Sequence, residues 1–163
     1  MPSARFLGLA AALTLALATP ALAGDYKVGA LTIKSPWTRP ALINMNGVGF
    51  MTFANAGPRP VRLLSAESPV AGKVEIHQSA MANGVMSMRR QDDGVVIPAG
   101  GSVAFAPGGY HLMLLGLKQP LVQGQKVPLT LVFDNGRRAA VELTAQSAAP
   151  QAGQGSAAEP HHH

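Results

Sequence analysis

Histidine and methionine side chains are concentrated in one part of this 163-residue sequence. Ten residues separate His77 from Met88, and twenty-two further residues lead to His111, which Met113 follows two positions later. Two more methionines lie inside the first of these intervals, Met81 and Met86. A fold that brings these groups together offers imidazole nitrogen and thioether sulfur to a metal ion.

The metal ion that best suits such a set of ligands is Cu(I). It is soft and accepts thioether and imidazole ligands, whereas Zn²⁺ prefers thiolate, imidazole and carboxylate, and Mg²⁺ and Ca²⁺ require oxygen. The sequence contains no cysteine, so it can build neither a zinc–thiolate site nor the Cys-containing site of a blue-copper protein. The pattern therefore indicates a site for Cu(I), or for the equally soft Ag(I).

Each of these residues also has a purely structural explanation. Methionine is a flexible side chain that commonly fills gaps in a core, and a single histidine at the end of a strand is often an ordinary surface group. Composition and spacing alone leave the structural and the metal-binding explanations open.

Other kinds of chemistry find little support in the sequence. No nucleophile elbow, phosphate-binding loop or dinucleotide fingerprint is present. Asp92 and Asp93 are adjacent, so on a strand they face opposite sides and cannot act as a paired carboxylate site. The net charge of +5 reflects the small number of acidic residues and not long runs of basic residues. Aromatic residues make up only 5% of the sequence. These features argue against an enzyme and against nucleic-acid binding.

The elements that must position the ligands are predicted to be strands. Apolar residues recur with a period of two, and turn signals such as Asn83-Gly84 and Asn135-Gly136 separate the apolar runs. We expect strands over residues 26–33, 47–55, 61–65, 73–77, 85–89, 95–97, 102–105, 111–115, 128–133 and 139–144. This pattern predicts a single all-β domain, an antiparallel Greek-key β-sandwich or small barrel.

Within that fold, two local features would help to gather the ligands. Asn83-Gly84 predicts a hairpin that folds Met88 back toward His77. His111 and Met113 are two positions apart on one predicted strand, so their side chains leave from the same face. We therefore expect two imidazoles and at least two thioethers at one end of the domain.

The two ends of the chain differ from the predicted domain at residues 24–145. Residues 1–23 have the pattern of a secretory signal peptide, with Arg5, an apolar run of about thirteen residues and a final Ala-Leu-Ala. A retained membrane anchor is the alternative, but a spanning helix needs roughly 20 apolar residues. The expected location of the mature protein is the periplasm. Residues 146–163 lack large apolar side chains and are expected to be a disordered tail.

That tail ends in three consecutive histidines, which are His161, His162 and His163. One interpretation is a flexible arm that offers imidazole to Cu(II), since borderline metals favour nitrogen ligands. The other is the remnant of a purification tag.

Several segments resemble the periplasmic Cu(A) copper chaperone family, PCu(A)C. The similarity is carried by KVEIH at 73–77, NGVMSMR at 83–89, IPAGGSV at 97–103 and PGGYHLMLLGLKQPL at 107–121. It extends over roughly residues 26–145 and contains the family's pattern of histidine, ten residues, methionine, about twenty residues and then His-x-Met. Many relatives have a further methionine two residues after the first histidine, where this sequence has Ser79.

The resemblance implies a cupredoxin-like fold that binds one Cu(I) through His77, Met88, His111 and Met113. Met81 and Met86 are the candidates for an auxiliary ligand, since by strand alternation Met86 faces the same side as Met88. The resemblance further implies a non-enzymatic carrier that helps to load the Cu(A) subunit of cytochrome c oxidase, with or without a Sco-type assembly factor. Two other functions use the same ligands. One is a periplasmic scavenger of Cu(I) or Ag(I), and the other is a copper-dependent redox enzyme.

Overall fold

A computed structural model describes residues 24–150 and shows a domain built entirely from strands. The signal-peptide prediction and the three terminal histidines lie outside the described residues. The strands of the described part are β1 (Tyr26–Val28), β2 (Leu31–Thr38), β3 (Gly47–Asn55), β4 (Val61–Glu67), β5 (Ala71–Ala82), β6 (Val85–Arg90), β7 (Val95–Ile97), β8 (Ser102–Phe105), β9 (Tyr110–Leu117), β10 (Lys126–Phe133) and β11 (Arg138–Ala145). The predicted all-β fold is confirmed. Residues 24–150 contain no helix with the length and hydrophobicity of a membrane-spanning segment.

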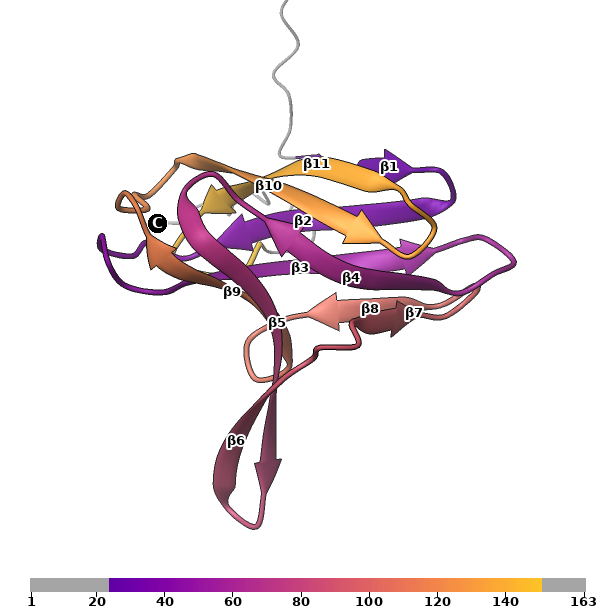
Figure 1. Ribbon diagram of the computed structural model, residues 1–163, viewed down its shortest axis with the longest axis horizontal. Helices are drawn as coiled ribbons and strands as arrows, with labels where there is room; N and C mark the ends of the chain where they lie inside the picture. The colour runs from indigo at the N-terminus through magenta and orange to yellow at the C-terminus, as the bar shows by residue number, and fades with distance from the viewer. Residues whose placement is uncertain (1–23, 151–163) are drawn as a thin grey trace, which may run out of the picture.

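All the strands belong to one sheet, which curls around its core (Figure 1). The order is β6-β5-β9-β8-β3-β2-β11-β10-β4-β7, with β1 paired to β2 and β9 also paired to β3. β4, near one end of this order, contacts β5, near the other end. Most neighbouring strands are antiparallel, as expected, whereas β11 runs parallel to β2 and β8 runs parallel to β9.

The core consists of apolar side chains that alternate along the strands and point into the curled sheet. At its centre the Phe53 ring packs edge-on against Phe105 and Phe133, with ring centroids 5.2 and 6.3 Å away. All three rings are buried. Burying one such side chain stabilises the fold by about 1.5–3 kcal/mol. The core therefore holds the strands that carry the predicted ligands without help from a metal ion.

The expected strand over residues 26–33 is in fact a hairpin. Gly29 has a φ of +63°, a conformation that suits glycine, and there the chain turns so that Val28 pairs with Leu31. The second strand of this hairpin then continues to Thr38. It passes Pro36 at an irregularity where its register with β3 shifts, and a proline without an N–H is tolerated at such a bulge.

The β5–β6 hairpin projects from the body of the domain (Figure 1). β5 extends to Ala82, five residues beyond the predicted end, because β6 pairs with its outer half at residues 77–82. Asn83 and Gly84 have φ values of +51° and +77°, as a tight two-residue hairpin turn requires. The hairpin predicted at this point is confirmed.

Candidate metal centre

Three neighbouring strands place the four predicted ligands on one face of the sheet. His77 on β5 lies directly opposite His111 on β9, and Met113 lies two positions further along β9. On the other side of β5, Met88 of β6 lies opposite Ser79. Residues directly opposite each other in an antiparallel pair share a face, as do residues two positions apart on one strand. The register therefore gathers both imidazoles and both thioethers on the same side of β6, β5 and β9.

The two imidazole rings lie side by side, with centroids 5.8 Å apart and planes inclined at 48°. His111 is buried, with only 5% of its surface exposed. Its Nδ1 lies 3.1 Å from the carbonyl oxygen of Gly109, to which it must donate because a carbonyl only accepts. This hydrogen bond places the proton on Nδ1 and leaves the lone pair of Nε2 free for another partner.

His77 is held in the opposite tautomer by Glu75. The His77 Nε2 atom lies 2.8 Å from Glu75 Oε2. A hydrogen bond from Lys73 Nζ at 2.7 Å, reinforced by the one from His77, lowers the pKa of Glu75 to about 2. Glu75 is therefore an anion that accepts the His77 Nε2 proton, which leaves a lone pair on Nδ1.

That Nδ1 atom of His77 is buried and has no hydrogen-bond partner. Buried polar atoms are nearly always paired, so an unpaired one calls for an explanation. A ligand to a metal ion would satisfy it, and a carboxylate bonded to the other ring nitrogen is the usual way in which proteins orient a histidine ligand. The donor set at this point therefore fits a metal ion bound by nitrogen.

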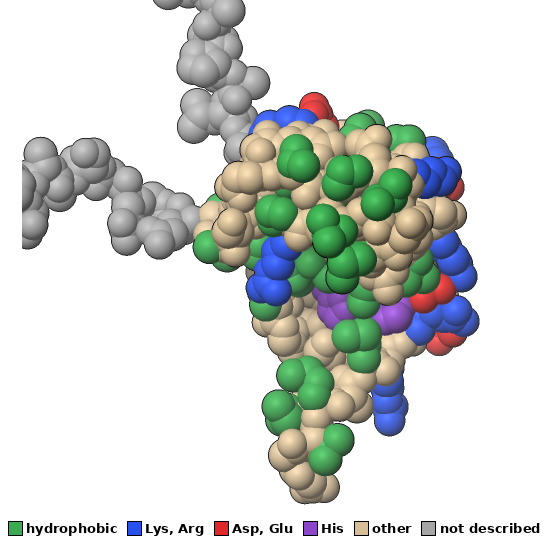
Figure 2. All heavy atoms as spheres, turned by 90° about the vertical axis from the view of Figure 1, so that its left-hand side faces the viewer, with side chains coloured by type: hydrophobic (Ala, Val, Ile, Leu, Met, Phe, Trp, Pro, Cys, Tyr) green, Lys and Arg blue, Asp and Glu red, His purple; other side chains and the backbone are tan. Residues whose placement is uncertain are grey.

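The two sulfur groups lie on either side of the imidazole pair, since Met113 is opposite Glu75 and Met88 is opposite Ser79. Met113 is half-buried, whereas Met88 stands on the projecting hairpin with 51% of its surface exposed. In Figure 2 the histidines lie where this hairpin joins the body of the domain, with apolar side chains above them and along the hairpin. A soft cation bound by these four residues would have Met88 as its most exposed ligand and His111 as its most buried one.

The charged groups beside the histidines are linked by ion pairs. Glu75 also accepts a hydrogen bond from Arg90 at 3.3 Å, and Arg90 forms an ion pair with Asp92. This contact with Asp92, followed by the one with Glu75, raises the pKa of Arg90 above its usual value. Within residues 24–150 no three His, Cys, Asp or Glu side chains cluster in a way that could hold a metal ion. The thioether and imidazole groups of this face suit a soft cation better than Zn²⁺ or Mg²⁺.

The two predicted auxiliary methionines are at the tip of the hairpin. Met81 lies directly opposite Met86, on the same face as Met88 and His77 but further from the body of the domain. The structure thus places the auxiliary sulfurs beyond Met88 rather than beside the two imidazoles.

Sequence reasoning missed two residues of this site, Glu75 and Gly109. The spacing Glu75-x-His77 was a usable signal, since two residues of a strand that are two positions apart share a face. Gly109 could not be found in this way, because its backbone carbonyl is the group that contacts His111.

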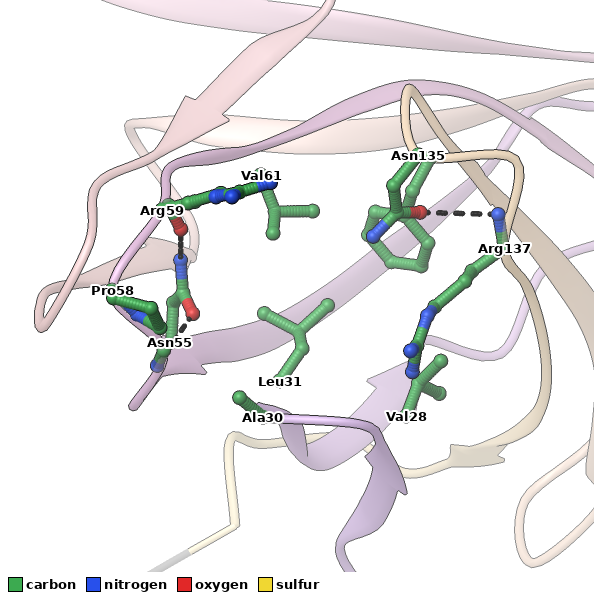
Figure 3. A pocket seen from close by; sticks show the side chains of 11 residues that line it. Val28, Ala30, Leu31, Asn55, Pro58, Arg59, Val61, Asn135 and Arg137 are labelled. Carbon is green, nitrogen blue, oxygen red and sulfur yellow. Dashed lines mark hydrogen bonds between the residues drawn. The ribbon is translucent and has the colours of Figure 1, made fainter.

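A pocket of about 170 Å³ lies at the far end of β3 (Figure 3). Arg59 and Arg137 stand on its two sides, and Leu31 and Val61 contribute to an apolar lining. None of the predicted ligands lines this pocket, so it is separate from the candidate metal centre.

Comparison with known proteins gives one family and several relatives. Residues 31–145 match the family described as "Putative lipoprotein LpqE-like". A protein of Leifsonia xyli subsp. xyli, named a "putative lipoprotein", is 34% identical over 111 residues, which make up 68% of this chain and 66% of that protein. An uncharacterized protein of Rickettsia prowazekii is 31% identical over 113 residues, 66% of this chain and 62% of that protein. The chain thus matches slightly less than two thirds of the length of either relative.

The fold is similar to several solved structures. The copper-bound PCuAC domain from PmoF2 has a TM-score of 0.64 and 26% identity, and the match covers 76% of this chain and 98% of that domain. The solution structure of CuI-DR1885 from Deinococcus radiodurans has a TM-score of 0.52 and 28% identity, covering 70% of this chain and 78% of that one. These similarities confirm the cupredoxin-like fold expected from the sequence.

Proposed function

This chain belongs to the LpqE-like family, which is the PCuAC family, and on that premise we propose that it is a copper chaperone that binds one Cu(I). The observation that carries the proposal is the unpaired Nδ1 of His77, buried on the face that also holds His111, Met88 and Met113. The copper-bound neighbour and the CuI-bound neighbour support the choice of metal and of oxidation state.

The ligands follow from the hydrogen bonds of the two imidazoles. Glu75 occupies Nε2 of His77 and the Gly109 carbonyl occupies Nδ1 of His111. His77 therefore binds copper through Nδ1 and His111 through Nε2. The thioether sulfurs of Met88 and Met113 complete the set, since both belong to the same face.

The ligand set suits a carrier better than a store. All four ligands are neutral, so the site retains the positive charge of Cu(I), and the nearby anionic Glu75 partly compensates it. Thioethers hold copper less firmly than thiolates do, and Met88 is half-exposed. An acceptor that carries two thiolates can therefore replace Met88 first and then take the ion. Copper remains Cu(I) throughout, so no electron is transferred and the protein acts without being an enzyme.

The proposed place of action is the periplasm, with residues 1–23 serving as the export signal. The lipoprotein names of the family and of the Leifsonia relative support an exported protein. The proposed acceptor is the Cu(A) subunit of cytochrome c oxidase, reached directly or through a Sco-type assembly factor. In this account the terminal residues His161, His162 and His163 form a separate, weaker site for Cu(II).

A scavenger of Cu(I) or Ag(I) would use the same four ligands, and a deletion strain separates the two functions. If the protein is a carrier, the strain loses oxidase activity when copper is scarce and recovers it when copper is abundant, because free copper then loads the oxidase unaided. Normal oxidase activity at low copper, together with growth failure at high copper, would favour the scavenger.

A further inference from the structure

Two of the most exposed apolar side chains of the domain stand together at the tip of the β5–β6 hairpin. Met81 and Met86 have 64% and 58% of their surfaces exposed. At such exposure neither side chain fills a gap in the core, so the usual structural explanation for methionine does not apply to them. Their common feature is a thioether sulfur that is open to solvent.

The hairpin turn fixes how these two side chains face each other. Asn83 and Gly84 form the two-residue turn, and Ala82 and Val85 are the hydrogen-bonded pair that closes it. Hydrogen-bonded and non-hydrogen-bonded pairs alternate along an antiparallel ladder, so the next pair, Met81 and Met86, is of the non-hydrogen-bonded kind. In such pairs the side chains approach most closely, with Cβ atoms about 4.5–5.5 Å apart. Two long and flexible thioethers at this spacing can converge on one ion.

The pair is aligned with the copper ligands. Met88, which lies opposite Ser79, is one row closer to the domain on the same face, and His77 is one row closer again. Successive rows on one face of a strand are about 7 Å apart. The three methionines thus lie in successive rows that lead from the tip of the hairpin to the imidazoles. No residue from Ser79 to Met88 has a carboxylate side chain.

We propose that Met81 and Met86 form a second, weaker site for Cu(I) or Ag(I), through which the ion enters and leaves the four-residue site. The proposal rests on the proposed function. Two neutral thioethers without an imidazole bind a soft ion less firmly than two thioethers with two imidazoles, so the ion moves inward. In each step one copper–sulfur bond to Met81 or Met86 breaks as one to Met88 forms, and copper remains Cu(I).

The first test follows the methionine methyl groups by NMR while Ag(I), as the nitrate, is added to the full chain. We expect the first equivalent to shift the methyl signals of Met88 and Met113, and further Ag(I) to shift those of Met81 and Met86. The exposed Met45, which lies outside the hairpin, is the internal control and should not move.

Three outcomes of this titration separate the inference from the proposed function. Signals of Met81 and Met86 that stay in place at every concentration overturn the second site. Signals that move together with Met88 in the first equivalent overturn it as well, because they show a single shared site. If only Met81 and Met86 respond, the second site exists and the proposed four-residue site is wrong.

The second test measures how fast Cu(I) enters the four-residue site from a weak chelator. The double variant Met81→Leu/Met86→Leu should keep its affinity within about twofold and load about tenfold more slowly, because an ion held beside the site has a raised effective concentration. Met45→Leu is the matched control and should load at the wild-type rate. Unchanged loading in the double variant overturns the entry role, and so does a loss of affinity as large as that of Met88→Leu.

Discussion

Replacing Glu75 with Gln should weaken Cu(I) binding about tenfold while leaving the fold intact. The Glu75 carboxylate accepts the Nε2 proton of His77 at 2.8 Å and thereby presents Nδ1 to the metal. The amide oxygen of Gln can still accept that proton, but the negative charge that partly compensates Cu(I) is lost. Removing a partner of a metal-binding histidine commonly costs 10–100-fold in affinity, and the retained hydrogen bond places this variant at the lower end, about tenfold.

Glu75→Ala removes the hydrogen bond as well as the charge, so its loss should lie near the upper end of the range, about 100-fold. The assay is competition for Cu(I) with a chromophoric chelator under reducing conditions. The matched control is Glu67→Gln, because Glu67 forms an exposed ion pair with Arg138 at 2.7 Å and lies outside the metal centre. Its Cu(I) affinity should equal that of the wild type.

Equal affinity in the wild type and in both Glu75 variants would contradict the role assigned to Glu75. It would mean that Glu75 does not orient the His77 ring in the copper-bound protein. Melting curves and circular dichroism of the metal-free variants show whether a loss of affinity reflects an altered site or an altered fold.

The sulfur ligands, the tail and the response to acid can be tested separately. Met88→Leu should change the free energy of unfolding by less than about 0.5 kcal/mol, because the side chain is half-exposed. The same substitution should weaken Cu(I) binding strongly. Undiminished Cu(I) affinity in both Met88→Leu and Met113→Leu would remove these two methionines from the ligand set. Deleting residues 146–163 should leave Cu(I) binding intact and abolish most Cu(II) binding in a metal titration, whereas tight Cu(II) binding by the shortened chain would place that site within the domain. Because the pKa of Glu75 is lowered in the folded protein, the ionised carboxylate stabilises the metal-free protein at pH values above its ordinary pKa of 4.5. This contribution disappears as the pH falls toward about 2. Denaturant unfolding between pH 5 and pH 2 should therefore show a shallower loss of stability in Glu75→Gln, and parallel curves would contradict the assignment.

Much of the site could be predicted because local patterns determine it. The Asn83-Gly84 turn fixes the β5–β6 hairpin, and the period of two along β9 places His111 and Met113 on one face. The strands β3, β7 and β8 were also predicted at their observed limits, since turn residues bound each alternating run.

The remainder depends on contacts between distant segments. Nothing local to His77 or His111 specifies that β5 and β9 pair in the register that sets the two rings side by side. The parallel pairing of β11 with β2 likewise arises from the way the sheet curls. The hairpin at Gly29 was missed because the apolar pattern continues across it, so only the positive φ of the glycine in the folded chain reveals the turn.

In the proposed site His77, Met88, His111 and Met113 together bind one Cu(I). The most direct test is X-ray absorption at the copper edge on protein loaded with one equivalent of copper under reducing conditions. We predict an edge typical of Cu(I) and a first shell that contains both nitrogen and sulfur, with the sulfur contribution reduced in Met88→Leu. A shell of nitrogen alone, or a spectrum that Met88→Leu and Met113→Leu leave unchanged, would contradict the assignment.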